Sequence, residues 1–72
     1  GIPTDVAFIA DVGLTGELKK VPSLEGRVRE LARMGFRKVY VAKDSFAKGF
    51  KIEEIDIISL KTLNDVIINI YR

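Results

Sequence analysis

The pattern of apolar and polar positions near the start of the chain predicts a β-hairpin. Apolar residues dominate the run from Asp5 to Val12, which is bounded by Pro3 and Gly13. A run of this length suits a largely buried strand better than a helix. After Thr15-Gly16, residues 17–21 mix apolar and charged side chains, as expected of a more exposed strand that returns as the second arm of a hairpin.

An amphipathic helix is predicted next. One apolar stripe recurs at positions i, i+4, i+7 and i+8, formed by Leu24, Val28, Leu31 and Ala32. Ser23 is expected to be the N-cap, with its hydroxyl accepting a free backbone amide of the first turn. Gly35 is predicted to end the helix in the left-handed conformation, with Phe36 packing back on the last turn.

The remaining pattern predicts two more strands and a final helix. Residues 38–42 are β-branched and aromatic, and a further strand is expected from Glu54 or Ile55 to Ser59. Between them, Phe46 and Phe50 favour a short helix that Gly49 weakens. Thr62 is predicted to cap the last helix, with Asp65 completing a capping box. The apolar face of that helix comprises Leu63, Val66, Ile67 and Ile70.

The order β-β-α-β-β-α predicts an α+β fold of two layers, with a helical layer covering one face of the sheet. The third and fourth strands are joined by a short crossover, which makes them candidates for parallel neighbours. The sequence contains no internal repeat or low-complexity linker, so residues 1–72 are interpreted as a single unit.

Composition then narrows the classes of function. The chain has 72 residues, of which 47% are hydrophobic and 31% charged, an ordinary globular mixture. It contains no cysteine and no histidine, which excludes disulfides, thiolate chemistry, imidazole bases and the usual zinc ligand sets. No apolar run is long enough to span a bilayer and no signal-peptide pattern is visible. We therefore expect a cytoplasmic location, with no membrane and no small-molecule substrate.

Three sets of residues are of types that bind phosphate, act as nucleophiles or bind metals, and all three favour a structural interpretation. Gly13 and Gly16 lie between two predicted strands, unlike the glycines of a Walker motif, so a turn is the preferred interpretation. The serines that a lysine base would have to activate are better explained as cap, turn and strand-end residues: Ser23, Ser45 and Ser59. The clustered carboxylates are interpreted as solvated surface charge, and we predict no metal: Glu53, Glu54 and Asp56.

Basic residues give a candidate DNA-binding surface. The net charge of +2 is too small to indicate nucleic acid by itself. Glu25 and Glu30 also dilute the basic residues of the first helix, so a solvated amphipathic face is favoured over a DNA contact on sequence alone. The candidate DNA-binding residues are Lys19, Lys20, Arg27, Arg29, Arg33, Arg37 and Lys38.

Several segments resemble the Lon-protease-like domain of the RadA/Sms DNA-repair ATPases. The stretch from Asp11 to Lys19, followed by Val21, is similar to the hairpin pattern of that family, and residues 27–36 are similar to its R-x-x-E-x-A-x-x-G-F helix. Residues 39–43 and 59–63 resemble its next strand and the start of its last helix. The motif residues are Asp11, Gly13, Leu14, Thr15, Gly16, Glu17, Arg27, Glu30, Gly35 and Phe36.

Two departures from that pattern keep alternatives open. Ala10 stands where the family mostly has glycine, and Ala42 where it mostly has proline. The related Lon-like domain of the ComM/YifB magnesium-chelatase-like ATPases is therefore an alternative, and a Lon-type serine peptidase fragment is a third. In the alignment with Lon peptidases, Glu25 occupies the position of the catalytic lysine, and a carboxylate cannot replace that ammonium group.

The resemblance implies a role and also what the chain lacks. It implies the C-terminal part of a Lon-like domain from a larger protein, without catalytic residues of its own, whose ATP, magnesium and zinc sites belong to other parts of the parent. The family's expected role is recombinational DNA repair, in which the ATPase drives branch migration and the Lon-like domain supports assembly and DNA contact. The implied partners are a second copy or the other half of the domain, and DNA.

Overall fold

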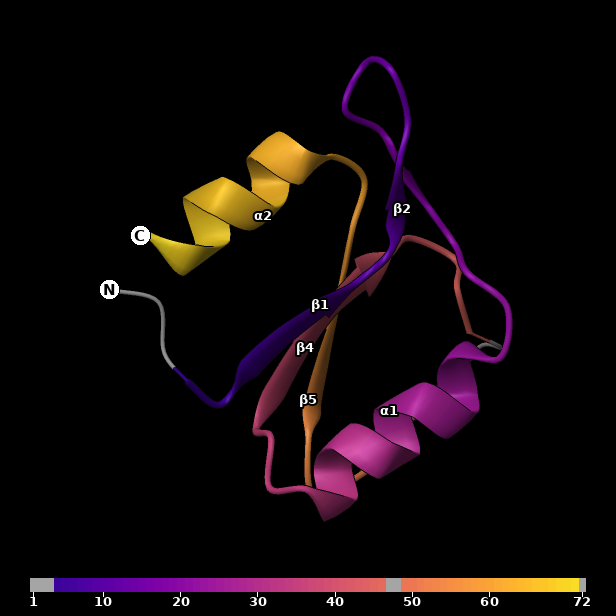
Figure 1. Ribbon diagram of the computed structural model, residues 1–72, viewed down its shortest axis with the longest axis vertical. Helices are drawn as coiled ribbons and strands as arrows, with labels where there is room; N and C mark the ends of the chain where they lie inside the picture. The colour runs from indigo at the N-terminus through magenta and orange to yellow at the C-terminus, as the bar shows by residue number, and fades with distance from the viewer. Residues whose placement is uncertain (1–3, 47–48, 72) are drawn as a thin grey trace.

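The computed structural model describes residues 4–46 and 49–71 (Figure 1). The mixed α+β class and the order of the elements are confirmed. The strands and helices are β1 (Val6–Ile9), β2 (Asp11–Val12), β3 (Leu18–Lys19), α1 (Leu24–Arg33), β4 (Lys38–Ala42), β5 (Asp56–Leu60) and α2 (Leu63–Ile70).

The strands form two sheets. β1, β4 and β5 make a parallel sheet in that order, with Val6 beside Lys38 and Lys38 beside Asp56. The predicted parallel pairing of the last two strands is thus confirmed. β2 and β3 form the predicted hairpin, with Asp11 opposite Lys19. The run predicted as one strand over residues 5–12 is interrupted at Ala10, because its first half pairs with β4 and its second half pairs with β3.

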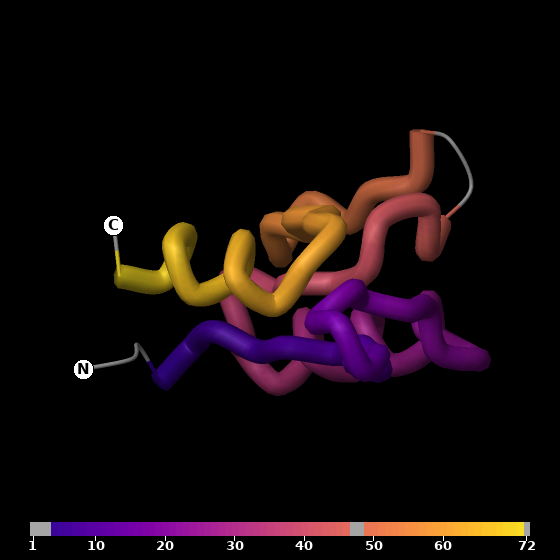
Figure 2. Tube along the Cα trace, turned by 90° about the horizontal axis from the view of Figure 1, so that it is seen from above, coloured from indigo at the N-terminus to yellow at the C-terminus, as the bar shows by residue number. Residues whose placement is uncertain are grey.

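The two helices lie on opposite sides of the parallel sheet (Figure 1). Each face is therefore covered by one helix, where the sequence analysis expected a helical layer on one face only. Residues Leu24 and Val28 of α1 pack on the sheet face that carries Val39 and Val41, together with Ile55. Side chains alternate along a strand, so Tyr40 and Ala42, which are also buried, belong to the face toward α2. Seen from above, the molecule is flattened (Figure 2), with extents of 32 × 30 × 17 Å.

The ends of α1 show one wrong prediction and one confirmed one. Ser23 occupies the N-cap position, but its backbone is left-handed, with φ of 58°, and its side chain makes no capping hydrogen bond. The left-handed backbone replaces the extended conformation that a capping serine requires. At the other end Gly35 has the predicted positive φ, 94°. The amide of Gly35 donates to the carbonyl of Ala32 and that of Phe36 to Leu31, at 3.1 and 3.0 Å, which is a Schellman motif.

The capping box of α2 is confirmed. The amide of Asp65 donates to the hydroxyl of Thr62 at 3.1 Å, and the amide of Thr62 donates to the carboxylate of Asp65 at 3.2 Å. These two bonds satisfy donors that the first turn of a helix otherwise leaves free. The start of α2 is therefore fixed by local sequence.

The connection from β4 to β5 begins with a turn at Lys43-Asp44, where Asp44 has a φ of 63°. The rings of Phe46 and Phe50 stack with centroids 4.6 Å apart. The short helix expected between these aromatic residues would include residues 47–48, which lie outside the described part of the chain.

Candidate nucleic-acid interface

The loop of the β2–β3 hairpin is held by a network of short-range hydrogen bonds. The amide of Gly13 donates to the carbonyl of Glu17 at 2.8 Å, and the amide of Gly16 donates to the carbonyl of Gly13 at 3.1 Å. The carboxylate of Glu17 turns back over the loop and accepts from both the amide and the hydroxyl of Thr15. Gly16 has a φ of 87°, a conformation that glycine adopts without steric cost.

Gly13 and Glu17 form a close contact that explains the glycine. A Cβ atom at position 13 would overlap the carboxylate of Glu17, so a larger residue would expel that carboxylate from Thr15. The hydrogen bond from the Thr15 hydroxyl lowers the pKa of Glu17 below its usual value of 4.5, because it stabilises the ionised form. The contact with Thr15 therefore favours the ionised carboxylate of Glu17.

The hairpin is also fixed to the start of α2. The amide of Leu18 donates to the carbonyl of Lys61, and the amide of Leu63 donates to the carbonyl of Gly16, both at 2.8 Å. Between these bonds Glu17 and Thr62 form an antiparallel bridge. The second arm of the hairpin thus lies between β2 and the 61–63 segment, and its loop projects beyond the sheet at the top of Figure 1.

Leu14 occupies the tip of this loop and is fully exposed. Its relative exposure is 106%, the highest among the large hydrophobic residues that the structure describes. Leu14 is one of the residues that resemble the RadA/Sms pattern, and the sequence alone indicated no role for it. Among the described residues none covers the Leu14 side chain, whereas Thr15, Gly16 and Glu17 are engaged in the hydrogen bonds of the loop.

The seven basic residues predicted to bind DNA do not form one surface. Lys19 lies opposite Asp11, just beyond the carboxyl end of β1, with Lys20 next to it. Arg37 and Lys38 lie at the amino end of β4, so the sheet separates the two pairs.

The three arginines of α1 are divided as well. Arg29 and Arg33 are four residues apart and share one side of the helix, whereas Arg27 projects from nearly the opposite side. Arg29 lies over the ring of Phe50, 5.5 Å from its centroid, and Arg33 forms an ion pair with Glu30 at 3.4 Å.

Two further lysines join Lys19 and Lys20 at the carboxyl end of the sheet. Lys43 follows β4 and Lys61 follows β5, and both side chains are exposed. The amide of Lys43 donates to the carbonyl of Leu60 at 2.9 Å, next to the bond that ties Lys61 to the hairpin. We call these four residues, Lys19, Lys20, Lys43 and Lys61, the lysine cluster. The DNA-binding set predicted from the sequence omitted Lys43 and Lys61, because this meeting depends on contacts between distant segments.

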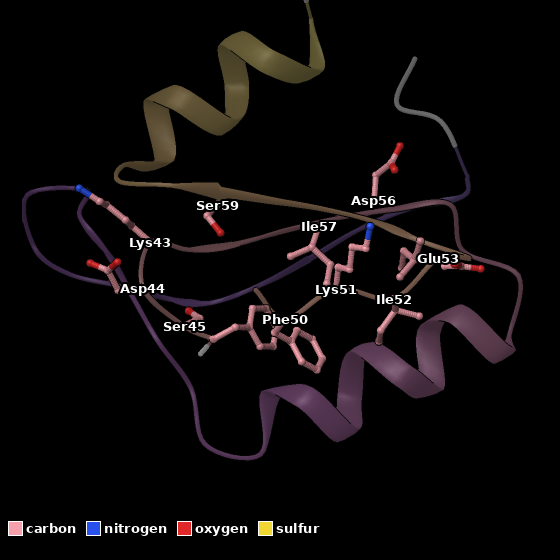
Figure 3. Close-up of a pocket in the computed structure, with 12 residues that line it drawn as sticks. Lys43, Asp44, Ser45, Phe50, Lys51, Ile52, Glu53, Asp56, Ile57 and Ser59 are labelled. Atoms are coloured by element: carbon pink, nitrogen blue, oxygen red, sulfur yellow. The ribbon is translucent and has the colours of Figure 1, made fainter. Parts of the chain in front are cut away.

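A hollow of about 570 Å³ opens beside β5 (Figure 3). Its lining mixes cations, carboxylates and the Phe50 ring, with Lys43 and Asp44 at one end and Glu53 and Asp56 toward the other. Ser45 donates its hydroxyl to the carbonyl of Ala42 at 2.6 Å, which is a structural bond. Within residues 4–46 and 49–71, no three His, Cys, Asp or Glu residues are placed to hold a metal ion. No helix of this described part is long and apolar enough to cross a membrane.

Most other residues of the family motif have a structural role. Gly35 and Phe36 end α1, and the amide of Met34 donates to the carbonyl of Glu30 at 3.0 Å. Glu25, which the sequence aligns with the lysine position of Lon peptidases as an expectation only, is exposed in the first turn of α1.

The fold and the carboxyl end of the parallel sheet define the class of protein. It is a small α+β unit with a projecting, hydrogen-bonded hairpin and a neighbouring group of exposed lysines. No family model matches the chain. It is, however, similar to proteins named DNA repair protein RadA: 36% identical over 64 residues to that of Streptococcus pneumoniae, 32% over 66 to that of Haemophilus influenzae, and 28% over 60 to that of Listeria monocytogenes.

These alignments cover 89%, 92% and 83% of the chain, but only 15%, 14% and 13% of the three relatives. The chain is thus a relative of the RadA DNA repair proteins over most of its own length, and it corresponds to about a seventh of theirs. This confirms the family resemblance found in the hairpin and helix motifs.

Proposed function

We propose that the chain is a non-catalytic, Lon-like assembly and DNA-contacting module of a RadA/Sms-type DNA-dependent ATPase in recombinational DNA repair. The relationship to RadA proteins over 83–92% of the chain carries this proposal. Branch migration would be the work of the ATPase part of such a protein. The alternatives are a ComM/YifB-type parent and a Lon-type peptidase, and the RadA-named relatives favour the RadA/Sms-type parent over both.

The DNA-contacting role rests on exposed basic side chains. Lys19 and Lys20 are exposed, and Lys19 is paired with Asp11 in the hairpin. Arg33 is partly engaged by Glu30, and surface pairs of this kind are weak, so phosphate can compete for the guanidinium. Contacts of this kind make binding strongly dependent on salt, because each neutralised phosphate releases counterions.

Fluorescence polarisation with labelled single-stranded and duplex DNA tests this role. We expect binding at low salt that weakens steeply as salt rises. Lys20→Gln should weaken binding and reduce the slope of log K against log salt by about 1, since one phosphate contact is lost. Lys51→Gln removes the same charge beside the hollow and should leave the slope unchanged. Absence of binding to either DNA at low salt would remove the DNA-contacting role.

The assembly role is proposed to use the outer side of α2. Leu63, Ile67 and Tyr71 recur every four residues and are 37%, 46% and 67% exposed, which makes a continuous apolar stripe. Asp65 is the only charged residue between positions 63 and 71, and it is engaged in the capping box. A second copy of the chain fits this stripe, because a two-fold contact brings each patch against itself and here brings no like charges together.

Sedimentation velocity at increasing concentration tests the assembly role. Wild type is expected to self-associate, and Ile67→Glu should shift it toward monomer because a charge is then placed in the apolar stripe. Asn69→Glu adds the same charge to an exposed position on another side of α2 and should leave association unchanged. A wild-type chain that stays monomeric at high concentration would contradict self-assembly through α2.

A further inference from the structure

The hairpin tip combines three features, and only the last of them, its charge, is explained by the proposed DNA contact. Its apolar side chain is fully exposed, its backbone is rigid, and its surroundings are charged. Leu14 has no burial in the fold, although exposing a leucine forgoes roughly 1.5–3 kcal/mol of hydrophobic stabilisation. A hydrophobic residue in this position is consistent with contact to something outside the chain.

The rigidity makes the tip suited to insertion. Hydrogen bonds from Thr15 to the Glu17 carboxylate close the loop. The hydrogen bonds that the backbone amides of Leu18 and Leu63 donate connect its second arm to the start of α2. A loop backbone held by hydrogen bonds loses less conformational freedom on binding than an unrestrained loop does. The tip is therefore preorganised, unlike the end of a flexible loop.

The charges around the tip favour nucleic acid over a protein pocket. The lysine cluster lies at the same end of the sheet, with Lys61 tied to the hairpin through Leu18. Acidic side chains are also present: Asp11 faces Lys19, Asp44 follows Lys43, and the Glu17 carboxylate is turned onto Thr15. The buried core of protein interfaces is depleted of charged residues such as lysine, whereas lysines suit the phosphates on either side of a base step.

We propose that the β2–β3 hairpin is a DNA wedge, in which Leu14 inserts between bases at a fork or junction while the lysine cluster contacts the flanking phosphates. This inference rests on the proposed DNA-contacting function and names the structural element that performs it. Apolar side chains such as leucine unstack base steps in other DNA-binding proteins. Insertion is easiest where pairing is already interrupted, since less unstacking energy is then required.

A forked duplex with 2-aminopurine at the last paired position tests the wedge, because this base brightens when it is unstacked. Polarisation of a separate dye on the same DNA measures binding independently. Wild type should bind and brighten the probe. Leu14→Ala should reduce the brightening at saturation by roughly threefold or more while changing the dissociation constant less than about threefold, since phosphate contacts supply most of the affinity.

Val12→Ala is the matched control. Val12 is 46% exposed on the same hairpin but not at its tip, so this variant should brighten the probe like wild type. Circular dichroism of both variants checks folding, which an exposed side chain affects little.

Three outcomes would overturn the wedge. If Leu14→Ala binds and brightens the probe like wild type, the wedge is refuted while DNA contact stands. If Leu14→Ala leaves the probe signal unchanged but weakens self-association in sedimentation, Leu14 contacts a second copy instead. If wild type does not bind the fork at low salt, both the wedge and the proposed DNA contact fail.

Discussion

We expect the core on the α1 side of the sheet to contribute most of the free energy of unfolding. The loss of this free energy in Val41→Ala tests that expectation. Val41 is fully buried in β4, in the cluster with Leu24 and Val28. Alanine removes two carbon atoms, which is about 1.6 kcal/mol at about 0.8 kcal/mol per buried carbon. The cavity left behind adds to this, because a packed interior collapses only in part, so we expect a loss of about 2–3 kcal/mol.

That loss is large for a chain of 72 residues. At about 0.05–0.15 kcal/mol per residue, the free energy of unfolding is about 4–11 kcal/mol. Urea titration followed by circular dichroism should show a clearly lower midpoint for Val41→Ala with an unchanged m-value. In thermal unfolding the midpoint should fall by about 4–8 °C for each kcal/mol lost.

The matched control is Val12→Ala, which makes the same chemical change in β2 at a side chain that is 46% exposed. Both positions lie in strands, so the difference in β-propensity largely cancels between them. We expect the control to lose less than about 1 kcal/mol. Equal losses for the two variants would refute the assignment of the core to the α1 face.

Three further predictions follow from local geometry. Gly26→Ala should raise the free energy of unfolding by about 0.5–1 kcal/mol in urea titration, because a Cβ there meets nothing within 4 Å and alanine favours the helix; a loss would contradict this reading of α1. Thr62→Ala should lower it by about 1 kcal/mol, since Asp65 loses its hydroxyl acceptor, and Thr62→Ser should restore most of it. The lowered pKa of Glu17 stabilises the folded state above pH 4.5, and this contribution is lost as the pH falls through the folded pKa. The stability advantage of wild type over Glu17→Gln should therefore shrink on acidification, and a pH-independent difference would count against the Thr15 contact.

The elements that could be predicted from sequence are those whose signals are local. Thr62 and Asp65 define the start of α2, and Gly35 ends α1, because each acts through hydrogen bonds within one or two helical turns. The strand at residues 38–42 was confirmed with both of its ends, since β-branched and aromatic residues fill a buried central strand.

Apart from the Ser23 cap, where the left-handed backbone replaces the predicted capping bond, the predictions that differ from the structure concern contacts between distant segments. The run over residues 5–12 breaks at Ala10 because its two halves pair with different strands: the part before the break pairs with β4 and the part after it with β3. Placement of α2 on the second sheet face depends on the path of the chain after β5, which the apolar stripe of a helix does not specify. The predicted DNA-binding set omitted Lys43 and Lys61 for the same reason, because the segment of Lys61 meets the hairpin through bonds such as that from the Leu18 amide to the Lys61 carbonyl.

The residues that carry the resemblance to RadA proteins can now be divided by what the fold explains. Thr15, Gly16 and Glu17 shape the hairpin loop, and Gly13 is required by the close approach of Glu17. Leu14 has no such explanation, because it contributes nothing to the core and lies fully in solvent. A loop whose other members are all used to hold one exposed leucine in place is best understood as a support for that side chain. This division makes Leu14 the first residue to replace when base unstacking by the hairpin is measured, whereas the lysines are the residues to replace when DNA affinity is measured.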